Sequence, residues 1–272
     1  MIEFTKAHAC GNDFLIVTEE AAQDHDWASL TRRLCARNTG IGADGIEFFA
    51  WTGPNSGRIR LHNADGSIAE ISGNGTRCVA AWMTQQRGCK QGHDLTIETD
   101  AGERVCHVNA IHAAGGYTVE VTAGMGVPTF VPRSLVLSDG TIIEGVEIST
   151  GNPHFVIVVE SAEFSIAGKS WQEIGAEICV HSAFPRQTNV EFLHIRSAQE
   201  IEIRIFERGV GPTTSSGTGS SAAATTALAL NDCISPLTVV APGGAQTIAW
   251  SGPGTELYLT GPASLIARGE AW

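Results

Sequence analysis

Basic residues are scarce in this sequence and are nowhere clustered. The chain of 272 residues has 17 Lys and Arg against 29 Asp and Glu, which gives a net charge of −12. Nucleic acids and anionic membranes are bound by clustered basic side chains, so this balance argues against both as partners. A small molecule or another protein remains as the ligand class.

Long apolar runs, paired cysteines and cofactor fingerprints are also missing. No stretch of about 18 apolar residues occurs, and the N-terminal segment carries His, Asp and Glu where a signal peptide needs an apolar block. Seven scattered cysteines without a Cys-x-x-Cys pair indicate reduced thiols rather than a disulfide framework or a zinc site. No P-loop or dinucleotide fingerprint is present. We therefore expect a soluble cytoplasmic protein that uses no metal and no organic cofactor.

What the sequence does contain is a glycine-rich motif that occurs twice. The copies are Ser72-Gly-Asn-Gly-Thr76 and Ser216-Gly-Thr-Gly-Ser220, which are 216 − 72 = 144 residues apart. Two strand–turn–helix units of one kind indicate a duplicated domain. A strand-like run precedes each turn and a helix-like run follows it, at 58–62 and 78–85 in the first copy and at 201–206 and 222–230 in the second.

A turn of this kind suits anion binding. Glycines let the backbone approach a ligand, and the first N–H groups of a helix, with the positive end of its dipole, receive an anion. If both copies hold one small anionic group, the opening serines face it from two sides, which suits removal of a proton on one side and its return on the other. A single copy is also compatible with an ordinary loop before a helix, and the repetition favours the functional interpretation.

The rest of the sequence alternates strand-like runs with turns and has few helical segments. We expect an α+β fold of two pseudo-symmetric domains, each a curled, mostly antiparallel sheet around a central helix, with the active site in the cleft between them. The N-terminal half spans 1–122 and is joined by a C-terminal strand at 262–272, while the C-terminal half spans 123–261. Helical spacing predicts helices at 27–37, 79–87, 171–178 and 222–230.

Further short motifs follow one another along the whole chain. With the two glycine turns they are Gly11-Asn-Asp-Phe14, Gly40-Ile-Gly-Ala-Asp-Gly45, Asn63-Ala-Asp-Gly-Ser67, Gly73-Asn-Gly-Thr-Arg-Cys78, Gly151-Asn-Pro-His154, Asn189-Val190, Glu207-Arg-Gly-Val-Gly211, Gly217-Thr-Gly219 and Pro242-Gly-Gly244. Together these motifs resemble the diaminopimelate epimerase family, the cofactor-free amino-acid epimerases of lysine and peptidoglycan biosynthesis, and the resemblance covers essentially the whole chain. It implies interconversion of LL- and meso-diaminopimelate by two-base transfer of the α-proton, and a homodimer is the default expectation for an oligomer.

The resemblance also exposes a departure at the catalytic positions. In that family two cysteines flank the substrate's α-carbon, and the matching positions here are Ser72 and Ser216. A thiol titrates near ~8.5, whereas a serine hydroxyl is several units less acidic and needs a separate base. By resemblance, His154 and Glu207 lie beside the two catalytic positions and assist them. Pro212 is a further departure, since the family usually has Glu there.

The substrate-binding residues are implied position by position. Taken singly, these residues also have structural interpretations, as turn amides, a loop histidine or a surface ion pair. The backbone donors to the reacting α-carboxylate are implied at Gly73-Asn74 and Gly217-Thr218. The groups that hold the distal amino-acid head are implied to be Asn12, Asn63, Asn152, Asn189 and Arg208.

The chain keeps the implied substrate-binding residues but has serine at both catalytic positions, and three explanations are open. The first is an engineered double Cys-to-Ser form. The second is a natural variant with weaker or different chemistry, such as a racemase of another amino acid, and the third is an amino-acid-binding protein that kept the pocket. Pro212 and the serine-rich surroundings of Ser216 favour a natural variant. Cys10 and Cys78 lie near the motifs as substitute thiols, although free cysteines are usually small buried hydrophobes.

Overall fold

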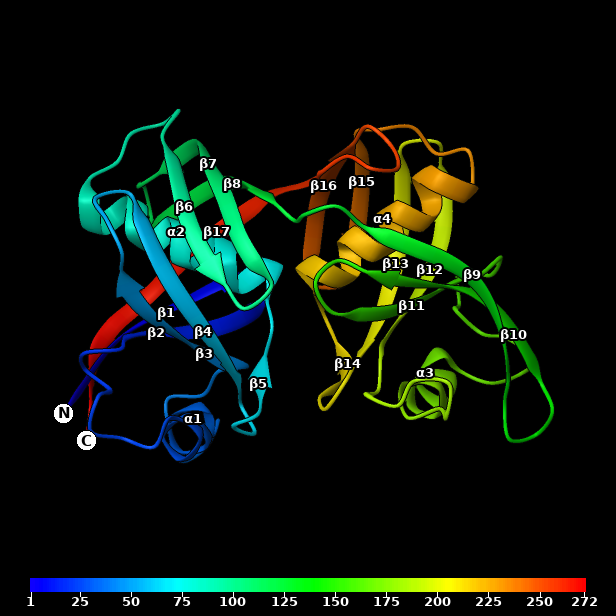
Figure 1. Cartoon of the computed structure of the whole chain (residues 1–272), viewed down its shortest axis with the longest axis horizontal. Helices are drawn as coiled ribbons and strands as arrows, with labels where there is room; N and C mark the ends of the chain where they lie inside the picture. The colour runs from blue at the N-terminus through cyan, green and yellow to red at the C-terminus, as the bar shows by residue number, and fades with distance from the viewer. The chain divides into compact units, whose positions relative to one another are not determined.

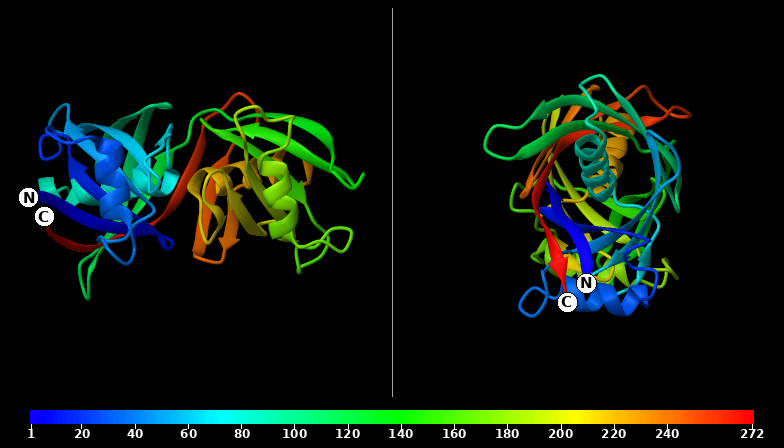
Figure 2. Two further views of the ribbon diagram at one scale, coloured as in Figure 1. Left: turned by 90° about the horizontal axis from the view of Figure 1, so that it is seen from below. Right: turned by 90° about the vertical axis from the view of Figure 1, so that its left-hand side faces the viewer.

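The computed structural model describes residues 1–272, which form two compact units. The first contains Met1–Gly124 together with Thr260–Trp272, and the second contains Met125–Leu259. The chain therefore leaves the first unit once and returns to it through its last strand (Figure 1). The two termini lie side by side in the first unit (Figure 1, Figure 2).

The first unit has two helices and a set of mostly short strands. Its helices are α1 (Trp27–Cys35) and α2 (Gly73–Arg87). Its strands are β1 (Ile2–Ala9), β2 (Asn12–Thr18), β3 (Gly45–Trp51), β4 (Ser56–Asn63), β5 (Ile68–Ala69), β6 (Asp94–Thr99), β7 (Gly102–His112), β8 (Tyr117–Gly124) and most of β17 (Leu257–Ala271).

The strands of the first unit close around α2. They pair in the cyclic order β17-β1-β2-β3-β4-β6-β7-β8-β17, and the β2–β3 and β4–β6 pairs are parallel. Helix α2 lies inside this ring and packs on its strands (Figure 2). Its residues 73–84 are all buried. Helix α1 packs on β3 and β4, where Leu30 and Leu34 join Ile46 and Phe48 in an apolar cluster.

The second unit repeats this plan. Its sheet has the order β9-β10-β11-β12-β13-β15-β16, the β11–β12 and β13–β15 pairs are parallel, and α4 packs against most of these strands. The elements are β9 (Thr129–Val136), β10 (Ile142–Ser149), β11 (Pro153–Val158), α3 (Trp171–Cys179), β12 (Asn189–Ser197), β13 (Glu200–Glu207), β14 (Gly211–Thr213), α4 (Gly217–Leu230), β15 (Leu237–Ala241) and β16 (Gly244–Trp250).

The duplication is visible element by element. The run β2, β3, β4, β5, α2, β6, β7 in the first unit has the same order and the same parallel pairs as β11, β12, β13, β14, α4, β15, β16 in the second. The predicted α+β fold, with a curled sheet around a central helix in each half, is confirmed. None of the helices combines the length and the apolar character needed to cross a bilayer.

Several predicted boundaries were wrong. The central helices begin at Gly73 and Gly217, about five residues earlier than their apolar spacing predicts, because the glycine motif is itself the first helical turn. The C-terminal strand predicted at 262–272 begins earlier, since β17 (Leu257–Ala271) continues through Pro262, which is exposed. The short strands β5 and β14 were not predicted.

Candidate active site

Ser72 and the glycines after it form the first turn of α2. Ser72 is the N-cap, with an extended backbone (φ −124°, ψ 120°), and its Oγ accepts a hydrogen bond from the backbone N–H of Gly75 at 3.1 Å. The N–H of Thr76 donates to the carbonyl of Ser72 at 2.8 Å. A serine in this position meets one of the unpaired N–H groups at the positive end of the helix. The predicted turn is therefore an anion-ready helix N-terminus.

Ser216 occupies the same position at the start of α4. Its backbone is extended (φ −145°, ψ 127°), and its Oγ accepts a hydrogen bond from the N–H of Gly219 at 3.2 Å. The N–H of Ser220 donates to the carbonyl of Ser216 at 3.0 Å. The side chain of Ser216 is buried, whereas that of Ser72 is half-buried. The two serine turns thus have the same pair of hydrogen bonds, with donor–acceptor distances of 3.1 and 3.2 Å to the serine Oγ and 2.8 and 3.0 Å to the serine carbonyl.

Side-chain amides surround the Ser72 turn. Asn74 Nδ2 donates to Asn12 Oδ1 at 3.1 Å, and Asn12 Nδ2 donates to Asp44 Oδ2 at 2.7 Å. The buried guanidinium of Arg77 donates to Asn74 Oδ1 at 2.5 Å. The structure therefore joins Asn12 and Asn74, which the sequence predicted to bind substrate, to each other.

Asn63 lies at the end of β4, in a turn of its own. Its Nδ2 donates to Ser67 Oγ at 3.0 Å. The next residue, Ala64, donates its N–H to the carbonyl of Asp44 at 2.9 Å. Because Asp44 also bonds Asn12, the Asn63 turn adjoins the amide pair described above.

An ion-pair network fixes this loop region. Arg37 Nη2 lies 2.9 Å from Asp13 and 2.6 Å from Asp44, and Lys6 Nζ lies 3.0 Å from Asp13. Burial raises the pKa of Asp13, but hydrogen bonds from Arg37 and Lys6 outweigh it and hold the pKa below its ordinary value of 3.8. Asp13 is therefore a structural carboxylate rather than a proton donor.

His154 begins a hydrogen-bonded chain in the second unit. Its Nδ1 lies 2.8 Å from Glu191 Oε1 and its Nε2 lies 2.8 Å from Asn152 Oδ1. Asn152 Nδ2 donates to Thr218 Oγ1 at 3.4 Å, which in turn lies 3.4 Å from Ser216 Oγ. The structure thus brings four predicted site residues together, and the connection from His154 to Ser216 runs through Asn152 and Thr218.

Asn189 and Arg208 are also joined. Asn189 Nδ2 donates to the carbonyl of Pro153 at 3.0 Å, and its Oδ1 accepts the backbone N–H of Arg208 at 2.9 Å. Glu207 is the last residue of β13 and is half-buried, opposite Gly211. The amide of Asn189 therefore ties β11 to the corner that carries Glu207 and Arg208.

The thiols near the motifs lie in unfavourable surroundings for proton transfer. Cys78 is inside α2 and fully buried, and burial raises the pKa of its thiol well above the ordinary value. Cys10 is 7% exposed and interacts with the buried guanidinium of Arg77. Cys78 therefore stays protonated at neutral pH and does not replace a catalytic thiolate.

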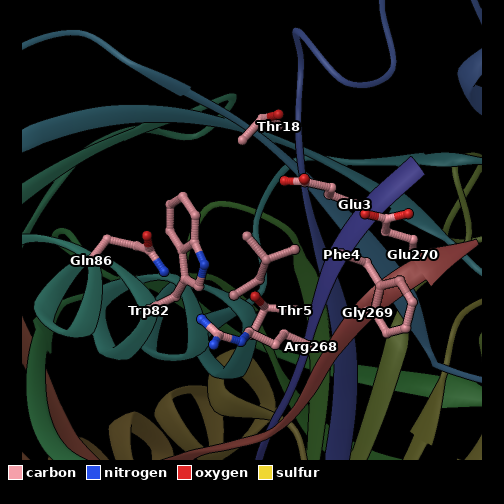
Figure 3. Close-up of a pocket in the computed structure, with 10 residues that line it drawn as sticks. Glu3, Phe4, Thr5, Thr18, Trp82, Gln86, Arg268, Gly269 and Glu270 are labelled. Atoms are coloured by element: carbon pink, nitrogen blue, oxygen red, sulfur yellow. The ribbon is translucent and has the colours of Figure 1, made fainter. Parts of the chain in front are cut away.

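A cavity of about 470 Å³ lies elsewhere in the first unit (Figure 3). Trp82 and Gln86, in the C-terminal half of α2, form one side, and Arg268 of β17 lies beside them. None of the predicted site residues lines it. No group of three or more His, Cys, Asp or Glu side chains converges as a metal site requires.

Comparison with known proteins decides the family. The model of the diaminopimelate epimerase family matches residues 4–131 and 146–266. The chain belongs to the diaminopimelate epimerase family. Diaminopimelate epimerases from Desulfitobacterium hafniense and from Pseudomonas savastanoi pv. phaseolicola are each 34% identical to it, over 98% and 99% of this chain and 97% and 99% of their own length. The family assignment made from the motifs is confirmed.

Solved structures of other proteins share the fold. A hydroxyproline epimerase from Agrobacterium vitis has a TM-score of 0.73 at 14% identity and covers 98% of this chain and 90% of its own. A phenazine biosynthesis protein from Bacillus anthracis has a TM-score of 0.71 at 17% identity, over 100% and 99%. At such low sequence identity, the structural similarity establishes only the fold of this family member and not its activity.

In this diaminopimelate epimerase family member, two buried glutamates lie beneath the serine turns, and the motifs did not reveal them. Glu47 of β3 and Glu191 of β12 are 191 − 47 = 144 residues apart and are 0% exposed. A methyl group on Gly75 would overlap Glu47 Oε1, and one on Gly219 would lie 2.7 Å from Glu191 Oε1. The glycine at the third helical position therefore leaves room for the carboxyl group in both units.

The two carboxyl groups have different surroundings. Glu191 pairs with His154, whereas neither oxygen of Glu47 has a hydrogen-bond partner. Burial raises the pKa of Glu47 from 4.5 to about 8, so this side chain is a neutral acid at pH 7. A spacing of 144 residues between two Glu-Phe pairs, at 47–48 and 191–192, is the sequence signal that would have revealed both.

Proposed function

We propose that the protein is a cofactor-independent epimerase that interconverts LL- and meso-diaminopimelate for lysine and peptidoglycan biosynthesis. Family membership supports this reaction, since relatives aligned over nearly their full length are named diaminopimelate epimerases. In the proposal one serine takes the α-proton and the other returns a proton to the opposite face of the carbon. Ser72 and Ser216 fill these two roles, with His154 and Glu207 assisting.

The observation that carries this proposal is the pair of identically capped helix N-termini. Each serine Oγ accepts an N–H of its own helix, and each sits at the positive end of a helix dipole. Negative charge on a carboxylate, or developing charge at the carbon beside it, is stabilised at such a position. An epimerase needs two such proton-transferring groups, and the occurrence of one serine turn in each unit supports this assignment.

Serine in place of cysteine lowers the expected rate. A thiol near ~8.5 yields thiolate at neutral pH, and helix N-termini lower its pKa further. A serine hydroxyl must pass its proton to a neighbouring base as it acts. We expect an activation free energy several kcal/mol higher than that of a thiol-bearing form. Each ~1.4 kcal/mol lowers the rate tenfold.

The remaining site residues divide between the two ends of the substrate. Gly73-Asn74 and Gly217-Thr218 supply backbone N–H groups to the reacting carboxylate. Hydrogen bonds hold Asn12 to Asn74 and Asn189 to the backbone of Arg208, which supports a site that is ordered before substrate binds. The distal amino-acid head is assigned to Asn12, Asn63, Asn152, Asn189 and Arg208.

Solvent-deuterium exchange tests the proposal. Purified protein incubated with LL-diaminopimelate in D₂O should yield the meso isomer with deuterium at the α-carbon. Ser72→Ala and Ser216→Ala should each abolish the meso product. Wild-type protein that neither exchanges the proton nor forms meso product would exclude the catalytic proposal.

One observation favours a second candidate, an isomerase or a binding protein in which the serines do not transfer protons. Both ring nitrogens of His154 are engaged, and His154 reaches Ser216 through two intervening side chains. If His154 or Glu207 is the acid–base group for another amino acid, His154→Asn should abolish turnover while Ser72→Ala should not. Calorimetry that shows diaminopimelate binding without exchange would identify a binding protein.

We place the reaction in the cytoplasm and propose a homodimer. All seven cysteines are free, which supports a reducing compartment. Light scattering coupled to gel filtration measures the oligomeric state, and a mass of 28.7 kDa would show a monomer. Partition of the native protein among cell fractions tests the compartment.

A further inference from the structure

The buried glutamates stand in the same relation to the two serines. Serine, glycine and glutamate recur with one spacing, since Ser72, Gly75 and Glu47 each have a counterpart 144 residues later. In the second unit a Cβ on Gly219 would lie 2.7 Å from the glutamate and 3.2 Å from the serine Oγ. In the first unit the same added atom would overlap Glu47 Oε1 and lie 3.2 Å from Ser72 Cβ. The carboxyl group and the serine therefore flank one glycine in both units.

Strand register shows why the two carboxyl groups differ. His154 pairs with Asn189, two residues before Glu191, in the parallel β11–β12 ladder. Phe14 pairs with Gly45, two residues before Glu47, in the parallel β2–β3 ladder. Phe14 thus occupies in the first unit the position that His154 occupies in the second. The first carboxyl group consequently has no imidazole partner.

No other charged group compensates Glu47. The strand residues on either side of it are Ile16 of β2 and Leu61 of β4, both apolar. Helix α2 presents Gly75 and Cys78 to it, and burial keeps the Cys78 thiol protonated by raising its pKa. Burying an unpaired carboxylate in such surroundings costs free energy, so the Glu47 side chain stays protonated in the free protein.

We propose that Glu47 is the proton partner of Ser72, a residue that acts through the serine and makes the first half of the site work without a thiol. This inference rests on the proposed epimerase function. The Glu47 carboxyl makes no hydrogen bond in the free protein, so in the proposed step it first turns toward Ser72 Oγ on the other side of Gly75. When the first half donates, the substrate carbanion then takes the proton of the Ser72 hydroxyl while Ser72 Oγ takes the proton of Glu47. The electrons of the broken O–H bond remain on Glu47 as a carboxylate, which the positive end of α2 stabilises.

The reverse direction uses the same groups. The Glu47 carboxylate takes the hydroxyl proton of Ser72 while Ser72 Oγ takes the α-proton of the substrate. A two-base reaction needs one half in its acid form when the other is in its base form. Two carboxyl groups in unequal surroundings provide this difference, with the lone acid under Ser72 and the His154-paired carboxyl under Ser216.

The alkaline pH dependence follows from the proton that Glu47 holds. The pKa of Glu47, raised by burial, is about 8, so the free enzyme loses this transferable proton as pH rises through that value. Since kcat/KM reports groups of the free enzyme, it should fall in both reaction directions above pH about 8. Glutamine matches the shape of the neutral acid but has no such proton to transfer.

The experiment compares Glu47→Gln and Glu47→Asp with the wild type and with Glu98→Gln, an exposed carboxyl on β6 that serves as a matched control. Glu47→Gln should lower kcat by about 10²- to 10⁴-fold with little change in KM, and should remove the alkaline limb. Glu47→Asp should regain part of the rate, and the control should match the wild type. Infrared spectra at pH 7 should show a protonated-carboxyl band that Glu47→Gln removes.

Each outcome has one meaning. An active wild type whose kcat and alkaline limb are unchanged by Glu47→Gln would overturn this inference and leave the epimerase function standing. Absence of the protonated-carboxyl band at pH 7 would overturn it as well. A wild type that does not turn over diaminopimelate would overturn the proposed function together with the inference. Thermal unfolding of Glu47→Gln at or above the wild-type midpoint shows that the variant is folded.

Discussion

Replacing Glu47 with Gln should stabilise the protein, and the gain should grow with pH. In the folded chain the Glu47 carboxyl is fully buried with neither oxygen hydrogen-bonded, and burial raises its pKa from 4.5 to about 8. In the unfolded chain it is exposed and titrates near 4.5. Between these values the folded state holds a proton that the unfolded state has released.

The sign and size follow from that difference in bound protons. The contribution of Glu47 to stability is most favourable below pH 4.5 and is lost as pH rises to about 8, by ~1.4 kcal/mol for each pH unit. The loss reaches about 5 kcal/mol at pH 8, within the total stability of about 5 to 15 kcal/mol typical of a domain. Glutamine cannot ionise, so Glu47→Gln avoids this loss.

Urea unfolding followed by tryptophan fluorescence measures the effect. The free energies of unfolding of wild type and Glu47→Gln should agree to within about 1 kcal/mol near pH 5 and differ by about 3 to 5 kcal/mol at pH 8. Other carboxyl groups titrate equally in both proteins and cancel in the difference. Glu98→Gln, at an exposed site, should show no such divergence.

A constant difference between wild type and Glu47→Gln from pH 5 to pH 8 would refute the reasoning. It would mean that the carboxyl group titrates alike in both states, and hence that a cation or water compensates it in the folded protein. The assignment of a neutral acid beneath the Ser72 turn would then fail. The proton-partner role proposed for Glu47 would fail with it.

Three further predictions concern the serine turns. The double variant Ser72→Cys with Ser216→Cys should raise the rate of α-deuterium incorporation by about 10²-fold or more, because thiols ionise near ~8.5, and an unchanged rate would argue against proton transfer at these positions. Ser216→Ala should lower the free energy of unfolding by ~1 kcal/mol through loss of the Gly219 cap, which chemical denaturation measures; no loss would mean that the cap is dispensable. Gly75→Ala should destabilise by about 1 to 3 kcal/mol because its methyl overlaps Glu47, and adding Glu47→Ala should recover part of the loss in a double-mutant cycle; purely additive effects would contradict the contact.

The sequence predicted the duplicated fold better than the boundaries of its elements. The serine turns were recognisable because glycine at fixed offsets after a strand has few other uses, and their repetition revealed the duplication. The same glycines hid the helix starts, since a glycine-rich segment has low intrinsic helix propensity. Here capping by Ser72 and enclosure by the surrounding strands outweigh that propensity, so α2 begins at Gly73.

Long-range pairing accounts for what the sequence did not predict. The two-residue strand β5 is defined by its pairing with β4, and Ile68–Ala69 is too short to show an alternating strand pattern. Glu47 lies in an apolar strand, where a charged residue is ordinarily interpreted as facing solvent. Only the helix packed above it shows that the side chain points inward, against a glycine that leaves it room.

In the proposed reaction the two similar halves have unlike tasks. Equivalent backbones place a serine, a glycine and a glutamate at corresponding positions in each unit, so the fold sets the positions of the groups proposed to react. The chemistry is then set by one neighbouring strand residue, which is Phe14 in the first unit and His154 in the second. An aromatic neighbour leaves the Glu47 carboxyl without a hydrogen-bond partner, whereas the imidazole of His154 is hydrogen-bonded to the Glu191 carboxyl. The proposed two-base reaction needs one half in its acid form and the other in its base form, and the unequal surroundings of the two carboxyl groups favour such a state.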